Sequence, residues 1–200
     1  MNKSILRLKN QHKNKNSVKI VGLVGLAGSG KSEAVRYIKS KRYPHVYFGG
    51  VVLQAIKDAG LEINPVNEKM MREKLRADYG KDVIVNKIVE QINKLIESGQ
   101  KRIIADGIYS WTEYKILKKN FPIEMKVIAL VPPKSMRHKR IGARPDRAFT
   151  PAEINDRDYN EIENLEKGGP IAMADYFIVN DGSISSTHKK IDKVLREIGF

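Results

Sequence analysis

The sequence contains no cysteine. This absence excludes disulfide bonds, thiolate metal sites and cysteine nucleophiles, and it is typical of intracellular proteins, so we expect a cytoplasmic location. The chain also lacks any apolar run near the roughly 18 residues that a membrane-spanning helix needs. Close to the amino terminus the apolar stretch is short and is interrupted by Arg7, which does not suit the core of a signal peptide. We therefore interpret residues 1–17 as a flexible basic tail.

Acidic residues are few relative to basic ones, 23 Asp and Glu against 37 Lys and Arg, which gives a formal net charge of +14. Such a charge attracts anionic partners, which include nucleotides, nucleic acids and acidic membrane surfaces. The net charge alone does not choose among these partners.

Apolar, β-branched runs alternate with segments of helical periodicity after residue 17. The runs predict strands at 18–25, 101–108, 125–132 and 174–181, and a short strand followed by a turn at 45–50. The periodic segments predict helices at 31–41, 51–60, 65–80, 81–99, 112–120, 134–142, 153–167 and 185–199. This alternation is typical of an α/β fold in which helices cover both faces of a parallel sheet. Because no linker or internal repeat divides the chain, we expect residues 18–200 to form one domain.

The octapeptide GLAGSGKS, residues 25–32, lies between the first predicted strand and the first predicted helix. It matches the phosphate-loop pattern G-x-x-x-x-G-K-[ST], for which this strand–loop–helix setting is the required context. Glycines let backbone N–H groups converge on an anion, and the helix N-terminus adds partial positive charge. Lys31 is expected to reach the β- and γ-phosphates, and Ser32 to ligate Mg²⁺. The residues assigned to nucleotide binding here are Gly25, Ala27, Gly28, Ser29, Gly30, Lys31, Ser32 and Glu33.

A metal at such a loop needs a partner carboxylate, and Asp106 is the candidate. It ends the apolar part of the strand predicted at 101–108, and ligands bind at the carboxyl ends of parallel strands. Two roles stay open for Asp106: a Mg²⁺ ligand together with Ser32, or a base that accepts a proton from the attacking group. The structural alternative is a carboxylate that caps the next segment.

Four arginines, Arg137, Arg140, Arg144 and Arg147, follow one another within a basic helix and the loop after it. Arginines that close over a site can neutralise the charge of a transferred phosphoryl group and exclude water. We therefore expect Arg140, Arg144 and Arg147 to act in catalysis from a lid at about 134–168. A solvated basic helix is the alternative. Nucleic-acid binding is a further one, although the cluster lacks the aromatic residues of a single-strand platform.

Arg72 and Arg76 are four residues apart on a predicted helix and so share one face. They could hold an anionic group of a phosphoryl acceptor. Ion pairs with Glu68 or Glu73 on the same helix are an equally reasonable interpretation.

Several nucleotide-using classes are disfavoured by missing motifs. A GTPase switch should carry an N-K-x-D motif late in the chain, and this sequence has none. Motor ATPases usually have a longer chain and an acidic pair after an apolar strand, whereas here a single Asp106 is followed by Gly107. A small domain with a basic lid segment favours a kinase of small molecules.

With GLAGSGKS, ADGIYS, the basic lid segment, NDRDYNEI and MADYFIVNDGS in this order, the chain resembles the P-loop kinases of nucleoside monophosphates and dephospho-coenzyme A. It is most similar to an uncharacterised, largely archaeal dephospho-CoA-kinase-like branch of that group, over about residues 18–195. The resemblance implies a three-layer sandwich with a five-stranded sheet in the order 2-3-1-4-5, and Mg·ATP as the donor. It also implies that the Asn180–Gly182 turn contacts the base, and that Arg157 assists substrate binding from the NDRD helix.

Two departures from the family pattern concern the acceptor. Dephospho-CoA kinases carry acidic residues on the second strand, where this sequence reads VYFGGVV. Related kinases place an arginine shortly after the Asp-Gly, where this chain has Tyr109. Tyr109 and Trp111 are therefore candidates either for stacking on a base or for packing in the core.

The sequence favours an ATP- and Mg²⁺-dependent kinase of a nucleotide or nucleotide-like acceptor, with Arg72, Arg76, Tyr109 and Arg157 as substrate-binding residues. A nucleotide-dependent nucleic-acid-binding protein is the alternative from another class, motivated by the basic tail and surface. A degenerate kinase that only binds ATP is the third hypothesis, and it is motivated by the missing acid on the second strand.

Overall fold

The computed structural model describes residues 18–144 and 149–200. The tail predicted at 1–17 and Arg147 lie outside the described residues. In the part of the chain that is described, no helix is both long and apolar enough to cross a membrane.

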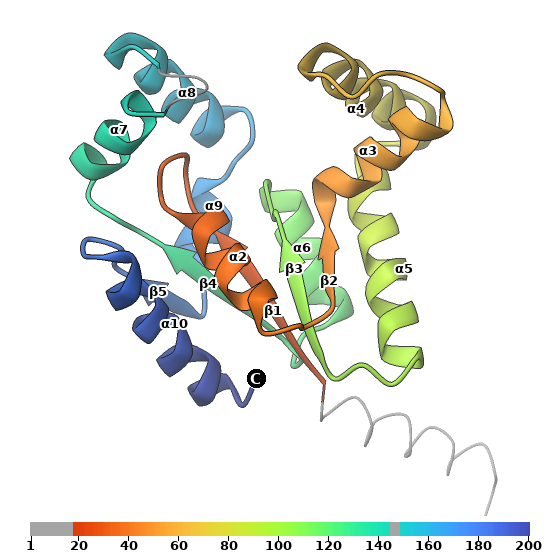
Figure 1. The fold of residues 1–200 in the computed structure, drawn as a ribbon. Helices are drawn as coiled ribbons and strands as arrows, with labels where there is room; N and C mark the ends of the chain where they lie inside the picture. The colour runs from red at the N-terminus through yellow and green to blue at the C-terminus, as the bar shows by residue number, and fades with distance from the viewer. Residues whose placement is uncertain (1–17, 145–148) are drawn as a thin grey trace, which may run out of the picture.

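Strands and helices alternate much as the periodicity predicts (Figure 1). The strands are β1 (Lys19–Val24), β2 (His45–Tyr47), β3 (Arg102–Asp106), β4 (Met125–Leu130) and β5 (Tyr176–Ile178). The helices are α2 (Lys31–Ser40), α3 (Phe48–Asp58), α4 (Pro65–Tyr79), α5 (Val83–Glu97), α6 (Trp111–Asn120), α7 (Lys134–Gly142), α8 (Pro151–Glu163), α9 (Gly168–Ala172) and α10 (Ile184–Ile198).

The five strands form one sheet in the order β2-β3-β1-β4-β5, and all neighbouring pairs are parallel. This confirms the fold class and the strand order that the resemblance implies. β1 lies at the centre, with Leu23 paired to Asp106 of β3 and to Ile128 of β4. The end of β1, where the glycine loop starts, is therefore next to the end of β3, where Asp106 lies.

Both faces of the sheet are buried, which explains why the strands are continuously apolar rather than alternating. On one face Ile20 packs in a cluster with residues of α3, α5 and α6. On the other face Val21 packs with residues of α2 and α10, and Figure 1 shows these two helices in front of the sheet. The layers are thus helix, sheet and helix, as predicted.

The segment predicted as strand and turn at 45–50 is different in the structure. β2 has three residues, and α3 begins at Phe48 rather than at residue 51. Gly49 and Gly50 lie inside this helix with the Tyr47 side chain against them, and a Cβ at Gly49 would require the Tyr47 ring to move. These glycines therefore provide room for a side chain and not a turn.

The helix predicted at 153–167 also differs. It begins at Pro151, because Thr150 and Glu153 form a capping box, and it ends at Glu163. The short helix α9 after it was not predicted. The last strand covers Tyr176–Ile178, which is less than the predicted 174–181.

Two helical pairs stand beyond the carboxyl ends of the strands, α7 with α8 on one side and α3 with α4 on the other (Figure 1). The glycine loop lies between them. Arg137 of α7 holds the first pair together, since its guanidinium donates to both carboxylate oxygens of Asp158 on α8 at 2.8 and 2.7 Å. Both residues are buried. Burial alone would raise the pKa of Asp158, but hydrogen bonds from Arg137 and His138 bring it below its ordinary value.

We expect Asp158→Asn to lower the free energy of unfolding by about 3 kcal/mol, because it leaves the buried Arg137 charge unpaired. Since the folded-state pKa of Asp158 is lowered, its contribution is present above about pH 4 and is lost as the pH falls through the folded-state value. Urea denaturation at several pH values measures both effects. Asp156→Asn, at an exposed position of the same helix, is the matched control, and an equal loss in the two variants would contradict the prediction.

Candidate functional site

The glycine loop joins β1 to α2 and has backbone that only glycine adopts easily. Gly28 and Gly30 have φ values of 76° and 90°. A Cβ at Gly28 would lie 2.6 Å from the Arg137 carbonyl oxygen. Within the described residues no hydrogen bond occupies the N–H groups of Gly28, Gly30, Lys31 or Ser32. These groups, at the N-terminus of α2, are the donors that an anion needs.

Side chains from distant segments hold this loop. The Asn180 side-chain amide donates to the Ser29 carbonyl at 2.8 Å, while its oxygen accepts from Thr187 at 2.6 Å. The Arg137 guanidinium donates to the Ala27 carbonyl at 3.0 Å. The side chain of Asn180, expected to contact a base, is therefore buried and directed at the loop. The backbone carbonyl of Asn180 accepts a hydrogen bond from Arg140 at 3.0 Å.

Lys31 and Asp106 form an ion pair at the mouth of the loop, with 3.0 Å between Nζ and Oδ1 and side chains that are 16% and 15% exposed. The register of β1 and β3 brings them together across 75 positions of sequence. Ser32 lies beside Lys31 and lines the same cavity. Lys31, predicted to bind phosphate, and Asp106, the candidate metal ligand, are thus in contact.

The residues present fit a magnesium ion. Among the described residues no three His, Asp or Glu side chains cluster as a complete metal cage. Mg²⁺ usually takes only one or two protein ligands and completes its shell with phosphate oxygens and water. The Ser32 hydroxyl and the Asp106 carboxylate are hard oxygen donors of this kind.

A cavity of about 390 Å³, the phosphate cavity, opens over the loop. Besides the loop itself, its lining side chains are Tyr109, Arg140, Arg144, Arg157, Glu161 and Lys167. With Lys31, the described part of the lining has five cations and a single carboxylate, a composition that selects anions. Arg140 contributes a buried guanidinium nitrogen, Nη1, that has no hydrogen-bond partner in the described part of the chain.

The arginines of the basic segment separate into two groups. Arg140 and Arg144 line the cavity, as expected, and so does Arg157. Arg137 does not, because its charge is used in the buried pair with Asp158. Arg147 lies outside the described residues.

Glu161 and Lys167 belong to the cavity but were not singled out from the sequence. The Glu161 carboxylate accepts a hydrogen bond from the Ala27 N–H at 2.9 Å and pairs with Lys167 at 3.0 Å. Both residues are buried. Burial lowers the pKa of Lys167, although the nearby Glu161 opposes this shift. The NDRDYNEI motif contains Glu161, yet nothing in its spacing marks this residue as a partner of the loop.

Arg72 and Arg76 belong to α4, and neither is among the residues that line the phosphate cavity. Among the described residues neither arginine pairs with Glu68 or Glu73, so the alternative based on helix-surface pairs is not what the structure shows. Arg76 instead lies near Glu113. Burial raises the pKa of the Glu113 carboxyl, and the positive charge of Arg76 partly opposes this shift. The Arg76 Nε atom is buried without a hydrogen-bond partner in the described residues.

The two aromatic candidates have different surroundings. Trp111 stacks on Tyr114, with 5.1 Å between ring centroids, and packs against the core. Tyr109 lines the cavity, and its ring lies below two lysines, with Lys31 at 5.5 Å and Lys167 at 5.2 Å from the centroid. Burial raises the pKa of the Tyr109 hydroxyl.

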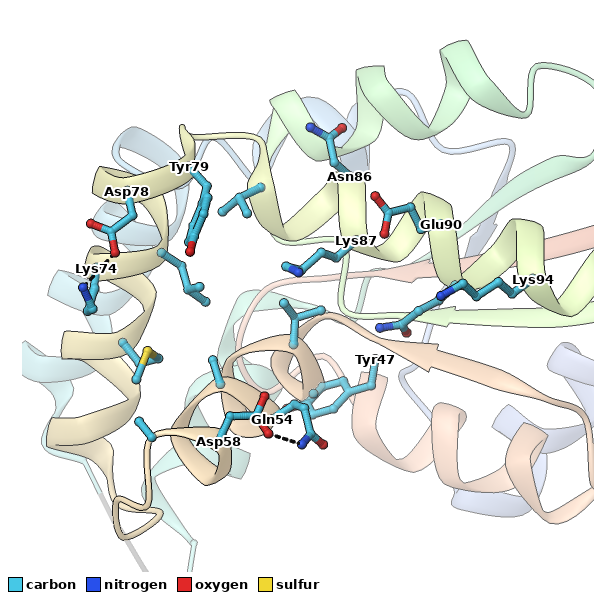
Figure 2. Close-up of a pocket in the computed structure, with 18 of the residues that line it drawn as sticks. Tyr47, Gln54, Asp58, Lys74, Asp78, Tyr79, Asn86, Lys87, Glu90 and Lys94 are labelled. Carbon is cyan, nitrogen blue, oxygen red and sulfur yellow. Dashed lines mark hydrogen bonds and ion pairs between the residues drawn. The ribbon is translucent and has the colours of Figure 1, made fainter.

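A second, larger hollow of about 1070 Å³ lies between β2, α3, α4 and α5 (Figure 2). Tyr47 lines this groove, whereas Tyr109 lines the phosphate cavity. Its charged side chains balance. The carboxylates are Asp58, Asp78 and Glu90, and the lysines are Lys74, Lys87 and Lys94. The groove therefore has no preference for anions comparable to that of the phosphate cavity.

Comparison with known proteins agrees with this geometry. A family model described as an AAA domain matches residues 21–166. A UPF0200 protein from Thermococcus kodakarensis is 31% identical over 182 residues, which cover 90% of this chain and 97% of that protein. The chain belongs to the AAA-domain and UPF0200 families.

Solved structures show the same fold. A gluconokinase from Sinorhizobium meliloti 1021 superposes with a TM-score of 0.55 at 15% identity, covering 90% of this chain and 93% of that one. A shikimate kinase from Acinetobacter baumannii, in complex with shikimate, gives 0.54 at 16% identity with the same coverage. At such identities the likeness shows the fold alone. The chain thus has a P-loop kinase-like fold, whose neighbours include kinases of small molecules.

The contacts that hold the glycine loop lead to a testable prediction. Asn180→Asp keeps an acceptor for Thr187 but replaces the donor to the Ser29 carbonyl by an oxygen, so two acceptors face each other. We expect a lower melting temperature and at least tenfold weaker ATP binding. Calorimetric titration and thermal denaturation measure the two effects. Asn120→Asp, the same exchange at an exposed position of α6, should leave the ATP affinity unchanged, and an Asn180→Asp protein with unaltered affinity would show that these contacts are dispensable.

Proposed function

We propose that the chain is an ATP- and Mg²⁺-dependent kinase that transfers a phosphoryl group to a nucleotide or nucleotide-like acceptor. The observation that carries this proposal is the Lys31–Asp106 pair at the mouth of the glycine loop, beneath a cavity with five cationic side chains. Phosphoryl transfer requires positioning and charge stabilisation above all, and this site supplies both.

In the proposed donor site, the N–H groups of the loop and of the first turn of α2 bind the β- and γ-phosphates. Lys31 neutralises part of their charge. Glu33 and Gly25 complete the loop region assigned to the nucleotide. Ser32 and Asp106 would hold Mg²⁺, which when bound offsets negative charge on the phosphates and fixes their orientation.

In the proposed reaction an acceptor oxygen bonds to the γ-phosphorus while the bond from this phosphorus to the β,γ-bridging oxygen breaks, so ADP leaves. When the acceptor oxygen belongs to a hydroxyl, as in dephospho-CoA, its proton goes to Asp106 if this residue serves as the base, and otherwise to solvent. The ionised phosphate oxygen of a nucleoside monophosphate has no proton to lose. Arg140, Arg144 and Arg157, with Arg147 beyond the described residues, stabilise the charge on the transferred group. We assign residues 134–168 as the lid that carries them, within a kinase domain of residues 18–200.

The acceptor is proposed to lie between this lid and α4. Arg76 and Arg72 offer positive charge there, and Arg76 has a buried donor without a partner in the described residues. Tyr109 occupies the position shortly after Asp106 and Gly107 where related kinases place an arginine. An acceptor with an anionic group and a nearby hydroxyl fits these residues, as dephospho-CoA and nucleoside monophosphates do.

The direct test is to mix the full-length protein with Mg·ATP and a panel of acceptors and to follow ADP. The panel contains dephospho-CoA, ribo- and deoxynucleoside monophosphates, nucleosides, and a 5′-hydroxyl oligonucleotide. ADP that forms only with one acceptor class supports the proposal and names the substrate. Slow hydrolysis that no acceptor changes would contradict it.

Lys31→Ala should reduce acceptor-dependent ADP formation by at least about a hundredfold, because it removes a charge aimed at the transferred group. The fold should remain, since the Lys31 side chain is partly solvated, and circular dichroism checks this. Lys39→Ala, at an exposed position of the same helix, is the control and should keep full activity. Near wild-type turnover of Lys31→Ala would refute the assignment of the loop.

A further inference from the structure

Glu161 is a carboxylate placed inside an anion-binding cavity. It is 4% exposed. One oxygen, Oε2, accepts from the Ala27 N–H of the glycine loop at 2.9 Å. The other, Oε1, lies 3.0 Å from Lys167 Nζ and 3.4 Å from Arg157 Nε. A loop amide, an ammonium and a guanidinium thus converge on this one side chain.

These three donors are the kinds that bind phosphate in proteins. All three belong to residues that line the phosphate cavity. The Glu161 carboxylate therefore already satisfies donors that an incoming terminal phosphate would require. A phosphate and a carboxylate could not share them, because two like charges at such a distance repel each other.

Lys167 is fixed in the cavity by its own backbone and ring contacts. Its N–H donates to the Glu161 carbonyl at 3.0 Å, which closes the turn between α8 and α9. Its ammonium lies over the ring of Tyr109, on which Lys31 also lies. Since burial lowers the pKa of Lys167, this charge needs an anion beside it, and Glu161 is the anion present.

We propose that Glu161 stands in for the terminal phosphate of the nucleotide while the site is empty, and that Lys167 is the phosphate-binding residue it releases when a triphosphate enters. This inference rests on the proposed function, since it assumes that the cavity receives ATP. Glu161 then opposes ATP binding, and Lys167 favours it. ADP has no γ-phosphate to displace the carboxylate, so neither residue affects its binding in the same way.

The two partners are therefore expected to respond with opposite signs. Glu161→Gln keeps the shape of the side chain and removes its charge, so it should tighten the binding of β,γ-imido-ATP about tenfold. Lys167→Met should weaken the same binding about tenfold. ADP affinity should change less than about twofold in both. Lys167→Arg, which keeps the charge, should retain most of the wild-type affinity for the triphosphate.

Isothermal titration of the full-length variants with β,γ-imido-ATP and with ADP measures these four effects, and thermal denaturation checks that each variant is folded. Glu163→Gln removes the same charge from an exposed position of α8 and should match the wild type. If Glu161→Gln weakens triphosphate binding as Lys167→Met does, Glu161 is only a support for the lysine and the inference is overturned. Equal changes for ADP and the triphosphate overturn it too.

If the proposed kinase function is wrong, the experiments give a different result from the one expected if only the inference about Glu161 is wrong. A wild-type protein that binds both nucleotides but forms no acceptor-dependent ADP is not a kinase, while the opposite signs for Glu161 and Lys167 still support the displacement of Glu161. If neither the wild type nor Glu161→Gln binds any nucleotide, both ideas are overturned.

Discussion

The shape of the glycine loop depends on polar contacts from segments more than 100 residues later in the chain. Asn180 donates to the Ser29 carbonyl, Arg137 donates to the Ala27 carbonyl, and Glu161 accepts from the Ala27 N–H. A loop rich in glycine has many accessible backbone conformations, and fixing one of them costs conformational entropy. Contacts made with buried partners offset this loss. The loop amides are thus preorganised only when β5, α7 and α8 are in place, so nucleotide binding depends on the whole fold.

The charges around this loop differ from those of an ordinary protein core, in which buried charges are paired with opposite ones. Burying cations without partners is unfavourable, yet five of them converge on the cavity, and among the described lining residues only Glu161 is an acid that faces them. Asp106 compensates Lys31 from the neighbouring strand, and Asp158 compensates Arg137 outside the cavity. The remaining positive charge attracts anions, and this local excess says more about function than the net charge of +14 does.

The sequence was sufficient for features that depend on local pattern. The apolar runs located all five strands, and GLAGSGKS located the loop, because chain geometry and glycine placement act over a few residues. The resemblance supplied the strand order. The partnerships of Arg137, Glu161 and Lys167 were not predictable, because each joins polar residues far apart in sequence, and no periodicity marks them. The start of α3 at Phe48 was missed for a related reason, since Gly49 is explained by the ring of Tyr47 and not by backbone preference.

Arg137 has one more consequence, for how the proposed lid could move. Its guanidinium joins the loop carbonyl of Ala27 to Asp158 of α8, so three segments meet at one buried point. A closing motion that detached α7 as a rigid unit would break these bonds at once. A proposed lid that closes without breaking these bonds therefore keeps Arg137 in place against the glycine loop.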